Sequence, residues 1–279
     1  MKADLHLHTT ASDGMLTPDQ VVELAKRHGL SAIAITDHDT IDGYLSAIES
    51  ADACGLKLIP GVEITTDFKG RECHILAYNI DPDHVEFREM LKGQRGIRRK
   101  RADQILGKLN KMGFDLDIAE VKAESGMGTI SRNHIAAALY RKRFVSTKRE
   151  AFDRFLNAKG PAYVQNVYPS VVSIIKLIRD AGGVSILAHP GKYYIYEDLK
   201  YFKDNGLDGF EYLHPSHTYE MQKKYQSYAD NYGMLLTGGS DFHGSRPYEE
   251  QHVGTIRVSV DRIDKIIELS ESRKQNLIT

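Results

Sequence analysis

Short apolar runs alternate with amphipathic stretches along most of the chain. Seven of the runs are strand-like, at residues 2–5, 31–35, 56–64, 74–78, 184–188, 209–213 and 234–237. Helical apolar spacing fills most of the intervals between them, at residues 18–29, 41–53, 170–181, 197–204 and 218–231, and a last helix starts at Asp261. Such alternation is typical of a mostly parallel sheet built from βα units, so the pattern predicts an α/β fold.

The alternation is interrupted once. From residue 84 to about residue 156 the apolar positions keep helical spacing, as at Ile105, Leu109 and Met112, which predicts helices throughout this segment. We therefore expect an all-helical insertion in the α/β unit. The predicted domains are a barrel domain of residues 1–82 and 157–279 and a helical insertion domain of residues 83–156.

Composition narrows the class of protein. The 279 residues are 41% hydrophobic and 27% charged, which suits one α/β barrel or two smaller globular domains. The net charge of -1 excludes a strong basic field, so a nucleic-acid contact would need a local basic patch. Cys54 and Cys73 form no CxxC pattern, and no run approaches the ~20 apolar residues of a membrane span. We expect reduced thiols, a cytoplasmic location and no membrane contact.

Metal-ligand side chains stand at or just beyond the ends of six predicted strands. His6 and His8 are one residue apart at the end of the first strand, so both can face one ion. In barrels of parallel strands the active site lies at the carboxyl ends of the strands, where distant residues converge. The candidate ligands are His6, His8, Asp13, His38, Glu63, His74, His189, Asp241 and His243.

The joint occurrence of these residues carries the metal hypothesis, because a single histidine at a strand end is usually an ordinary polar residue. Without a metal, the nine side chains would form a buried polar cluster that is costly to desolvate. His74 fits least well, since it lies inside a strand-like run. Mixed imidazole and carboxylate ligands favour Mn, Fe or Zn over Ca.

Several of these segments resemble the motifs of the PHP (polymerase and histidinol phosphatase) superfamily. The matching segments are His6-Leu7-His8, Thr36-Asp37-His38-Asp39, Gly61-Val62-Glu63, Ala188-His189-Pro190 and Ser240-Asp241-Phe242-His243. Two mid-chain segments, 130–136 and 181–184, resemble the TrpH-like group, which includes nucleoside 3',5'-bisphosphate phosphatases and 5'-to-3' exoribonucleases. The resemblance covers nearly the whole chain and implies a distorted (β/α)7 barrel with a helical insertion.

The resemblance also implies a site for two to three divalent ions, Mn first among them, with Glu63 as a bridging ligand. The implied ligand sets are His6, His8, Glu63 and Asp241 for the first ion; Glu63, His74 and His189 for the second; and Asp13, His38 and His243 for the third. Water bound to the metals, lined by Asp13, His38 and His189, would be the nucleophile. Asp37 and Asp39 would orient ligand histidines or cap the following helix.

A basic run at residues 95–101 is the leading candidate for substrate recognition. Such a run is often only a solvated helix face, but the family pattern Arg-x-x-Arg-Ala matches residues 98–102. A second basic element of the family matches Arg132 and His134. Arginine forks bind phosphate oxygens in pairs, so the resemblance implies that a phosphate remote from the metals contacts Arg98, Arg101, Arg132 and His134. His217 is a weaker candidate, and three loop tyrosines, Tyr193, Tyr194 and Tyr196, could stack on a base.

These observations predict a metal-dependent phosphoesterase that acts on nucleotides or on the 5' ends of short RNA, with no obligate protein partner. Two alternatives remain open, a histidinol-phosphate-type phosphomonoesterase and a non-enzymatic, metal-bearing interaction module. An amidohydrolase-type deaminase also opens with the HxH pattern. It would not be expected to carry Thr36-Asp37-His38-Asp39 so soon afterwards.

Overall fold

A mixed β-sheet forms the centre of the computed structural model, which describes residues 2–126, 128–165, 167–245 and 248–278. Within these ranges the sheet has eight strands in the order β7-β6-β5-β4-β3-β2-β1-β8. The strands are β1 (Lys2–Leu7), β2 (Ala32–Ile35), β3 (Lys57–Phe68), β4 (Arg71–Tyr78), β5 (Val184–Leu187), β6 (Gly209–Leu213), β7 (Leu235–Gly238) and β8 (Val258–Ser259). The seven predicted runs are all present, and β8 is an additional short strand.

The sheet curves until the chain that follows its end strand β7 reaches β1, next to the other end strand, β8. The segment after β7 lies along β1, where Leu7 forms a parallel bridge with Phe242 and the His8 N–H donates to the Phe242 carbonyl at 2.9 Å. Gly239 permits this approach, because a Cβ there would lie 2.5 Å from the backbone nitrogen of His6. The sheet is therefore a nearly closed barrel, and the predicted α/β barrel class is confirmed.

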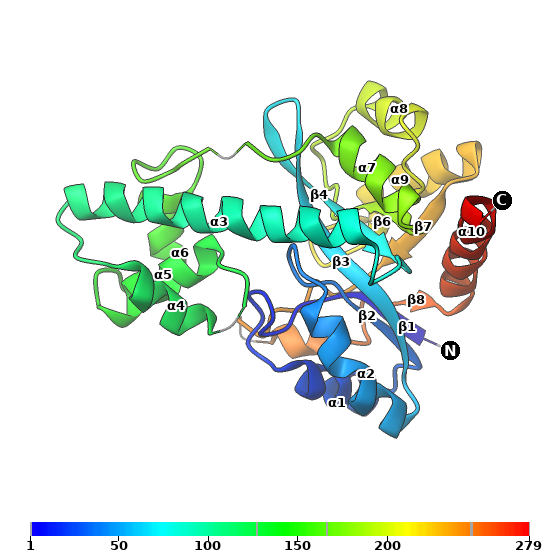
Figure 1. The fold of residues 1–279 in the computed structure, drawn as a ribbon, viewed down its shortest axis with the longest axis horizontal. Coiled ribbons are helices and arrows are strands. Elements are labelled where there is room, and N and C mark those ends of the chain that lie inside the picture. Colours follow the sequence, from blue (N-terminus) through cyan, green and yellow to red (C-terminus); the bar gives the residue numbers. More distant parts are fainter. Residues whose placement is uncertain (1, 127, 166, 246–247, 279) are drawn as a thin grey trace.

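Helices surround the barrel (Figure 1). They are α1 (Pro18–Arg27), α2 (Asp42–Cys54), α7 (Val171–Asp180), α8 (Tyr196–Asp204), α9 (Tyr219–Tyr232) and α10 (Asp261–Ile278), with a 3-10 turn at Glu249–His252. The sequence encodes the start of α1, where Thr17 and Gln20 form a capping box and Pro18 takes the first helical position. Among the described residues, no helix is both long enough and apolar enough to cross a membrane.

The β3–β4 hairpin departs from the parallel arrangement that the pattern favoured. β4 is antiparallel to both β3 and β5. Lys69 and Gly70 connect the hairpin, and their φ values of 54° and 76° fit a tight two-residue turn with both residues in the left-handed region. As a result β3 and β4 extend well beyond the predicted runs. Residues in the middle of β3 and of β4 therefore lie at the end of the barrel where the parallel strands end.

Between residues 84 and 156, the described chain is mostly helical, as predicted. It forms α3 (Val85–Lys111), α4 (Ile118–Ser125), α5 (Arg132–Arg141), α6 (Lys148–Ala151) and a π-helical turn (Phe152–Leu156). Figure 1 shows α3 reaching away from the barrel, with α4, α5 and α6 beside its far half. These helices have a hydrophobic cluster of their own around Ile105, Leu109 and Leu139. The domain boundaries at residues 83 and 156 stay a prediction.

Candidate metal centre

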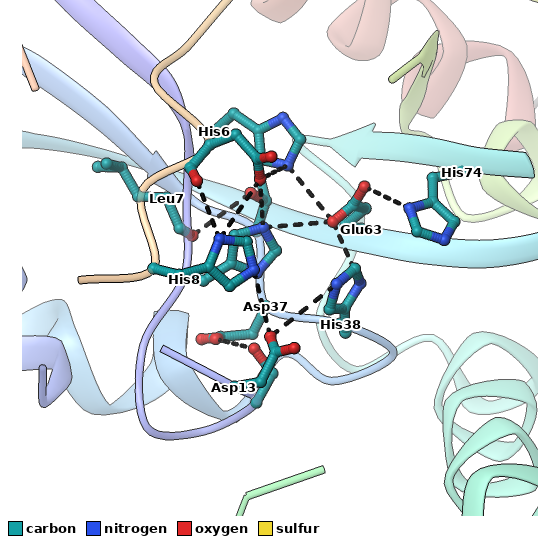
Figure 2. A network of polar contacts seen from close by, with 12 residues as sticks. His6, Leu7, His8, Asp13, Asp37, His38, Glu63 and His74 are labelled. Atoms are coloured by element: carbon teal, nitrogen blue, oxygen red, sulfur yellow. Dashed lines mark hydrogen bonds and ion pairs between the residues drawn. The ribbon is translucent and has the colours of Figure 1, made fainter. Parts of the chain in front are cut away.

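Imidazole and carboxylate side chains gather at one end of the barrel (Figure 2). β1 and the loop after it contribute His6, His8 and Asp13, while β2, β5 and β7 end just before His38, His189, Asp241 and His243. The hairpin contributes Glu63 from β3 and His74 from β4. Thr65 pairs with His74 across the hairpin, and Glu63, two residues from Thr65, shares its face. The structure thus brings together all nine predicted ligands, including His74.

Glu63 occupies the middle of the cluster with 1% of its side chain exposed. Its Oε1 lies 2.8 Å from both His74 Nδ1 and His189 Nε2. Its Oε2 lies 3.3 Å from the Nε2 atoms of His6 and His8 and 3.1 Å from His38 Nδ1. One carboxylate therefore faces five imidazoles, which is the arrangement expected of a bridging ligand.

Two further carboxylates flank Glu63. Asp241 Oδ1 lies 3.3 Å from His6 Nε2 and 3.2 Å from His8 Nε2. Asp13 Oδ1 lies 3.4 Å from His243 Nε2 and 3.9 Å from His38 Nε2. Asp241 also lies 3.7 Å from His243 Nδ1 and, through Oδ2, 3.2 Å from His214 Nε2, so it contacts four imidazoles, whereas Asp13 contacts two.

Three groups of ligand atoms are compact enough to hold an ion, with all atoms of a group within 4.8 Å of one another. They are His6, His8, Glu63 and Asp241; His8, Asp13, His38 and His243; and His38, Glu63 and His74. The first equals a predicted ligand set, and the second contains another. The third contains Glu63 and His74 of the remaining predicted set, with His38 in place of His189. His189 nevertheless contacts Glu63 directly.

The cluster has the properties expected of a metal site. Among the described residues, five buried atoms of the candidate ligands form no hydrogen bond: His6 Nε2, His8 Nδ1, His8 Nε2, Asp13 Oδ1 and His38 Nδ1. Leaving such an atom unsatisfied costs about 1 to 3 kcal/mol each, whereas a cation would serve several of them at once. These donor atoms therefore fit divalent transition metals.

Proton affinities in the cluster lead to the same conclusion. Burial would lower the pKa of His6, but the carboxylates of Glu211 and Glu63 raise it well above its ordinary value. Burial would also lower the pKa of His243, but Asp13 and Asp241 raise it to about 10. The carboxylates thus attract positive charge strongly, and a divalent cation can supply that charge in place of protons.

Glu211, in β6, supports the cluster from behind and was assigned no role in the sequence analysis. It is fully buried, and its Oε1 lies 3.0 Å from His6 Nδ1. Its Oε2 accepts the backbone N–H of His189 at 2.7 Å, which helps to hold His189 at a φ of 27°. A carboxylate that binds Nδ1 leaves Nε2 of the same ring facing the metal site. The available signal was a carboxylate within an otherwise apolar strand.

Replacing Glu211 with Gln should weaken metal binding by about 10- to 100-fold, the usual effect of losing an outer partner of a ligand histidine. The amide loses the negative charge beside His6 and cannot accept a hydrogen bond with its nitrogen. Competition with a chelator measures the affinity. Asp208→Asn removes another carboxylate close to the start of the same strand, paired with Arg273, and should leave metal affinity as it is. Equal affinities in wild type and Glu211→Gln would exclude this role.

Comparison with known proteins identifies the family. A model of the PHP domain matches residues 4–168. The chain belongs to the PHP domain family. A 5'-3' exoribonuclease of Haemophilus influenzae is 34% identical over 275 residues, 97% of this chain and 98% of that protein. A 3',5'-nucleoside bisphosphate phosphatase of Chromobacterium violaceum is 32% identical over 249 residues, 86% of each chain.

A solved PHP-type structure extends the comparison to the fold. A candidate metal-dependent phosphoesterase from Bifidobacterium adolescentis superposes with a TM-score of 0.89 at 32% identity, covering 96% of each chain. The predicted resemblance to the PHP superfamily is confirmed, and with it the assignment of the chain as a metal-dependent phosphoesterase. The non-enzymatic alternative finds no support in these comparisons.

Asp37 and Asp39 in the PHP motif Thr36-Asp37-His38-Asp39 do not act as predicted. Asp37 accepts hydrogen bonds from the loop that carries Asp13, at 2.8 Å from Thr9 N and 2.5 Å from Ser12 Oγ. Asp39 accepts from Thr65 N at 2.9 Å and from Arg98 Nε at 2.5 Å. Both carboxylates thus position the backbone on either side of the metal site. Among the described residues neither forms a hydrogen bond to a candidate ligand histidine, and the start of α2 has no side-chain cap, so neither of the two predicted roles is seen.

The predicted arginines line a pocket next to the PHP metal centre. A cavity of about 140 Å³ is bounded by Asp13, His38 and His74 on the metal side and by Arg98, Arg101 and Arg132 on the helical side. Arg98 is tied to Asp39 and donates to Thr65 Oγ1 at 2.6 Å. Arg101 and Arg132 both lie near Glu72, at 3.3 and 3.7 Å. The arginines converge as predicted, although Arg98 is more firmly engaged within the protein than the other two.

The two predicted histidines of the substrate set have structural roles. His134 completes the capping box of α5, where its Nδ1 accepts the Ser131 N–H at 3.0 Å. His217 uses both ring nitrogens on the backbone: Nδ1 lies 2.9 Å from the Tyr212 carbonyl, and Nε2 accepts the Gly191 N–H at 3.0 Å. His217 therefore has no ring nitrogen left for a phosphate, and that prediction is wrong.

Proposed function

We propose that the protein hydrolyses the phosphate ester at the 3' oxygen of a nucleotide that carries a 5'-phosphate. The substrate would be a nucleoside 3',5'-bisphosphate or the 5' end of a short oligoribonucleotide. One observation carries this proposal: the arginine-lined pocket opens directly onto the metal centre, sharing Asp13, His38 and His74 with it. A substrate with two phosphates can thus place one at the metals and the other among the arginines.

The two substrates require the same chemistry. A water oxygen attacks the phosphorus, the bond from phosphorus to the 3' oxygen breaks, and the 3' oxygen leaves with a proton. A bisphosphate yields a nucleoside 5'-monophosphate and inorganic phosphate. An oligoribonucleotide yields the same monophosphate and a strand shortened by one residue that keeps a 5'-phosphate. This common bond accounts for the two activities named among the relatives.

The proposed ligands are those of the sequence analysis, and two or three ions fit them, with Glu63 shared between two. Bound divalent ions would lower the pKa of water and neutralise charge on the reacting phosphate. The resemblance to the PHP superfamily makes Mn our first choice, and Fe and Zn are alternatives that the imidazole and carboxylate ligands also fit. We assign Asp13, His38 and His189 to the surroundings of the water that would attack. Cys54 and Cys73 are unpaired thiols, which supports the proposed cytoplasmic location.

A phosphate-release screen tests the proposal. Metal-loaded protein should hydrolyse nucleoside 3',5'-bisphosphates and 5'-phosphorylated oligoribonucleotides with a higher kcat/KM than histidinol phosphate or p-nitrophenyl phosphate. A preference for histidinol phosphate would favour the phosphomonoesterase alternative instead, because that substrate has no second phosphate for the arginine pocket.

Replacing Arg132 with Ala should reduce discrimination between these substrates. The ratio of kcat/KM on a nucleoside bisphosphate to kcat/KM on p-nitrophenyl phosphate should fall by about 10- to 150-fold, equivalent to about 1.5 to 3 kcal/mol for a hydrogen bond to a charged group. Arg132 suits this test because 27% of its side chain is exposed and its closest hydrogen bond, to the Leu156 carbonyl, is long at 3.3 Å. Arg141→Ala, at the other end of α5, is the control. An unchanged ratio would show that Arg132 does not bind the second phosphate and that the arginines of the pocket have a structural role.

A further inference from the structure

We propose that a second groove at the metal centre binds the nucleoside on the 3' side of the scissile phosphate, so that the protein cleaves RNA strands as well as mononucleotides. This inference rests on the proposed function. The groove has a volume of about 700 Å³, five times that of the arginine pocket, and its lining includes Arg71, His74, Arg132, Tyr163, His189 and Tyr193. His74 and His189 both contact the central carboxylate of Glu63, so the groove reaches the reacting position.

The arginine pocket and the groove leave the metal centre in different directions. The pocket borders Asp13 and His38, whereas the groove borders His189, and the two share Glu72, His74 and Arg132. A phosphate at the metals therefore has space for a substituent on each side. A nucleoside 3',5'-bisphosphate has a nucleoside on one side of its 3'-phosphate only. An RNA strand has a nucleoside on both sides of this phosphate, so its second nucleoside can occupy the groove.

Three segments enclose the groove. They are the turn of the β3–β4 hairpin, the chain that leaves the inserted helices near Tyr163, and the loop after β5 that carries Tyr193. Gln165 Nε2 donates to the Gly70 carbonyl at 3.2 Å and so ties the first two segments together. Two of the three segments are thus joined to each other before any substrate binds.

The chemistry of the lining suits a nucleotide. Tyr193 is 67% exposed and offers a ring on which a base can stack. Arg71 is exposed and forms no ion pair among the residues that the structure describes, so its guanidinium can bind a phosphate. The acidic residues of the lining are already engaged: Asp67 accepts the Gly70 N–H at 3.1 Å, and Glu72 lies between Arg101 and Arg132.

The other two tyrosines predicted to stack on a base, unlike Tyr193, do not offer an exposed ring in the groove. Tyr194 is buried, with its ring 5.3 Å from that of Phe202 and 6.0 Å from that of Phe68. Tyr196 is hydrogen-bonded to Tyr232 on the outer surface of α8 and α9. Of the three, Tyr193 is the one whose ring is both exposed and part of the groove.

Replacing Tyr193 with Ala tests the inference on two matched substrates, adenosine 3',5'-bisphosphate and the 5'-phosphorylated dinucleotide pApA. They share the first nucleoside and differ only beyond the reacting phosphate. The ratio of kcat/KM on pApA to kcat/KM on the bisphosphate should fall by about 5- to 150-fold, the range for loss of one stacked base. Tyr193→Phe keeps the ring and should restore the ratio. Tyr219→Ala removes an equally exposed tyrosine, also at 67%, from α9 and should not change it.

A binding measurement makes the result independent of turnover. The probe is a 5'-phosphorylated trinucleotide with a non-hydrolysable phosphonate at the first linkage and 2-aminopurine as the second base. Its fluorescence should be quenched by wild type and Tyr193→Phe but not by Tyr193→Ala. Equal kinetic losses on both substrates would place the first nucleoside in the groove and overturn the inference. An unchanged ratio, or quenching without the ring, would also overturn it. If the wild-type protein hydrolysed neither substrate, the proposed function would be refuted instead. The fluorescence of the probe would still show whether the groove binds the RNA strand.

Discussion

Replacing Glu63 with Gln should reduce phosphate release by more than about 100-fold, since even residues that merely support a ligand are worth 10- to 100-fold. Glu63 contacts five histidines through its two oxygens. An amide is neutral and offers one oxygen in place of two, so the binding of more than one ion should weaken together. Activity assays and metal analysis of the same preparation measure both effects.

Loss of folding must be separated from loss of metal in this variant. Burial would raise the pKa of Glu63, but the imidazoles of His38 and His74 lower it well below its ordinary value. Glu63 is therefore negatively charged in the native protein, and the substitution removes that charge. Asp198→Asn removes another buried carboxylate, paired with Lys69 at 2.6 Å away from the cluster, and should retain metals and activity. Full metal occupancy with near-normal turnover in Glu63→Gln would refute the bridging assignment.

Removal of metal should abolish activity, with a decrease of at least about 1000-fold, because activation of water and charge neutralisation together supply several kcal/mol of the catalysis. Protein purified without chelator should contain at least two transition-metal equivalents per chain. Dialysis against a chelator should remove them, and Mn²⁺, Fe²⁺ and Zn²⁺ added singly should show which ion restores turnover best. Less than one equivalent after soaking in Mn²⁺ would exclude a multinuclear centre.

The same titration should raise the melting temperature, because an ion that binds only the folded state stabilises it. The chelated protein retains protons where the ions would bind, since the carboxylates hold the pKa of His243 near 10 and that of His6 above its ordinary value. Metal binding at neutral pH should therefore release protons, which calorimetry in buffers of different ionisation enthalpy can count. Glu63→Gln should show a smaller rise in melting temperature than wild type. An equal rise would indicate that the ions bind elsewhere.

Strand alternation predicted an α/β fold, the resemblance to the PHP superfamily predicted the barrel, and residue chemistry predicted the nine side chains that the structure brings together. The reason is geometric. Strands that end at the same side of a barrel bring their last side chains together, so ligand-type residues after β1, β2, β5 and β7 meet wherever the loops run. His74 looked least convincing because it lies inside a strand. It reaches the cluster because β4 is antiparallel to β3, so that His74 lies opposite Thr65. Thr65 and Glu63 point to the same face of β3.

That hairpin was not predictable from residue types. Its turn places Lys69 at a φ of 54°, in a region that Gly, Asn and Asp adopt far more readily than Lys. Without an Asn-Gly or Asp-Gly signal, no hairpin was predicted between residues 64 and 74. The tertiary sheet stabilises the turn, since β4 forms ladders with both β3 and β5.

The candidate ligands could be named before the fold was known, because donor atoms and a place at a strand end are properties of the residues themselves. The tertiary structure decided which polar groups hold the ligands and which remain available to a substrate. Arg98 pairs with Asp39, 59 residues away, Glu211 reaches His6 across 205 residues, and His217 binds the backbone through both ring nitrogens. Such partnerships depend on packing between distant segments. They therefore appear only when the barrel closes.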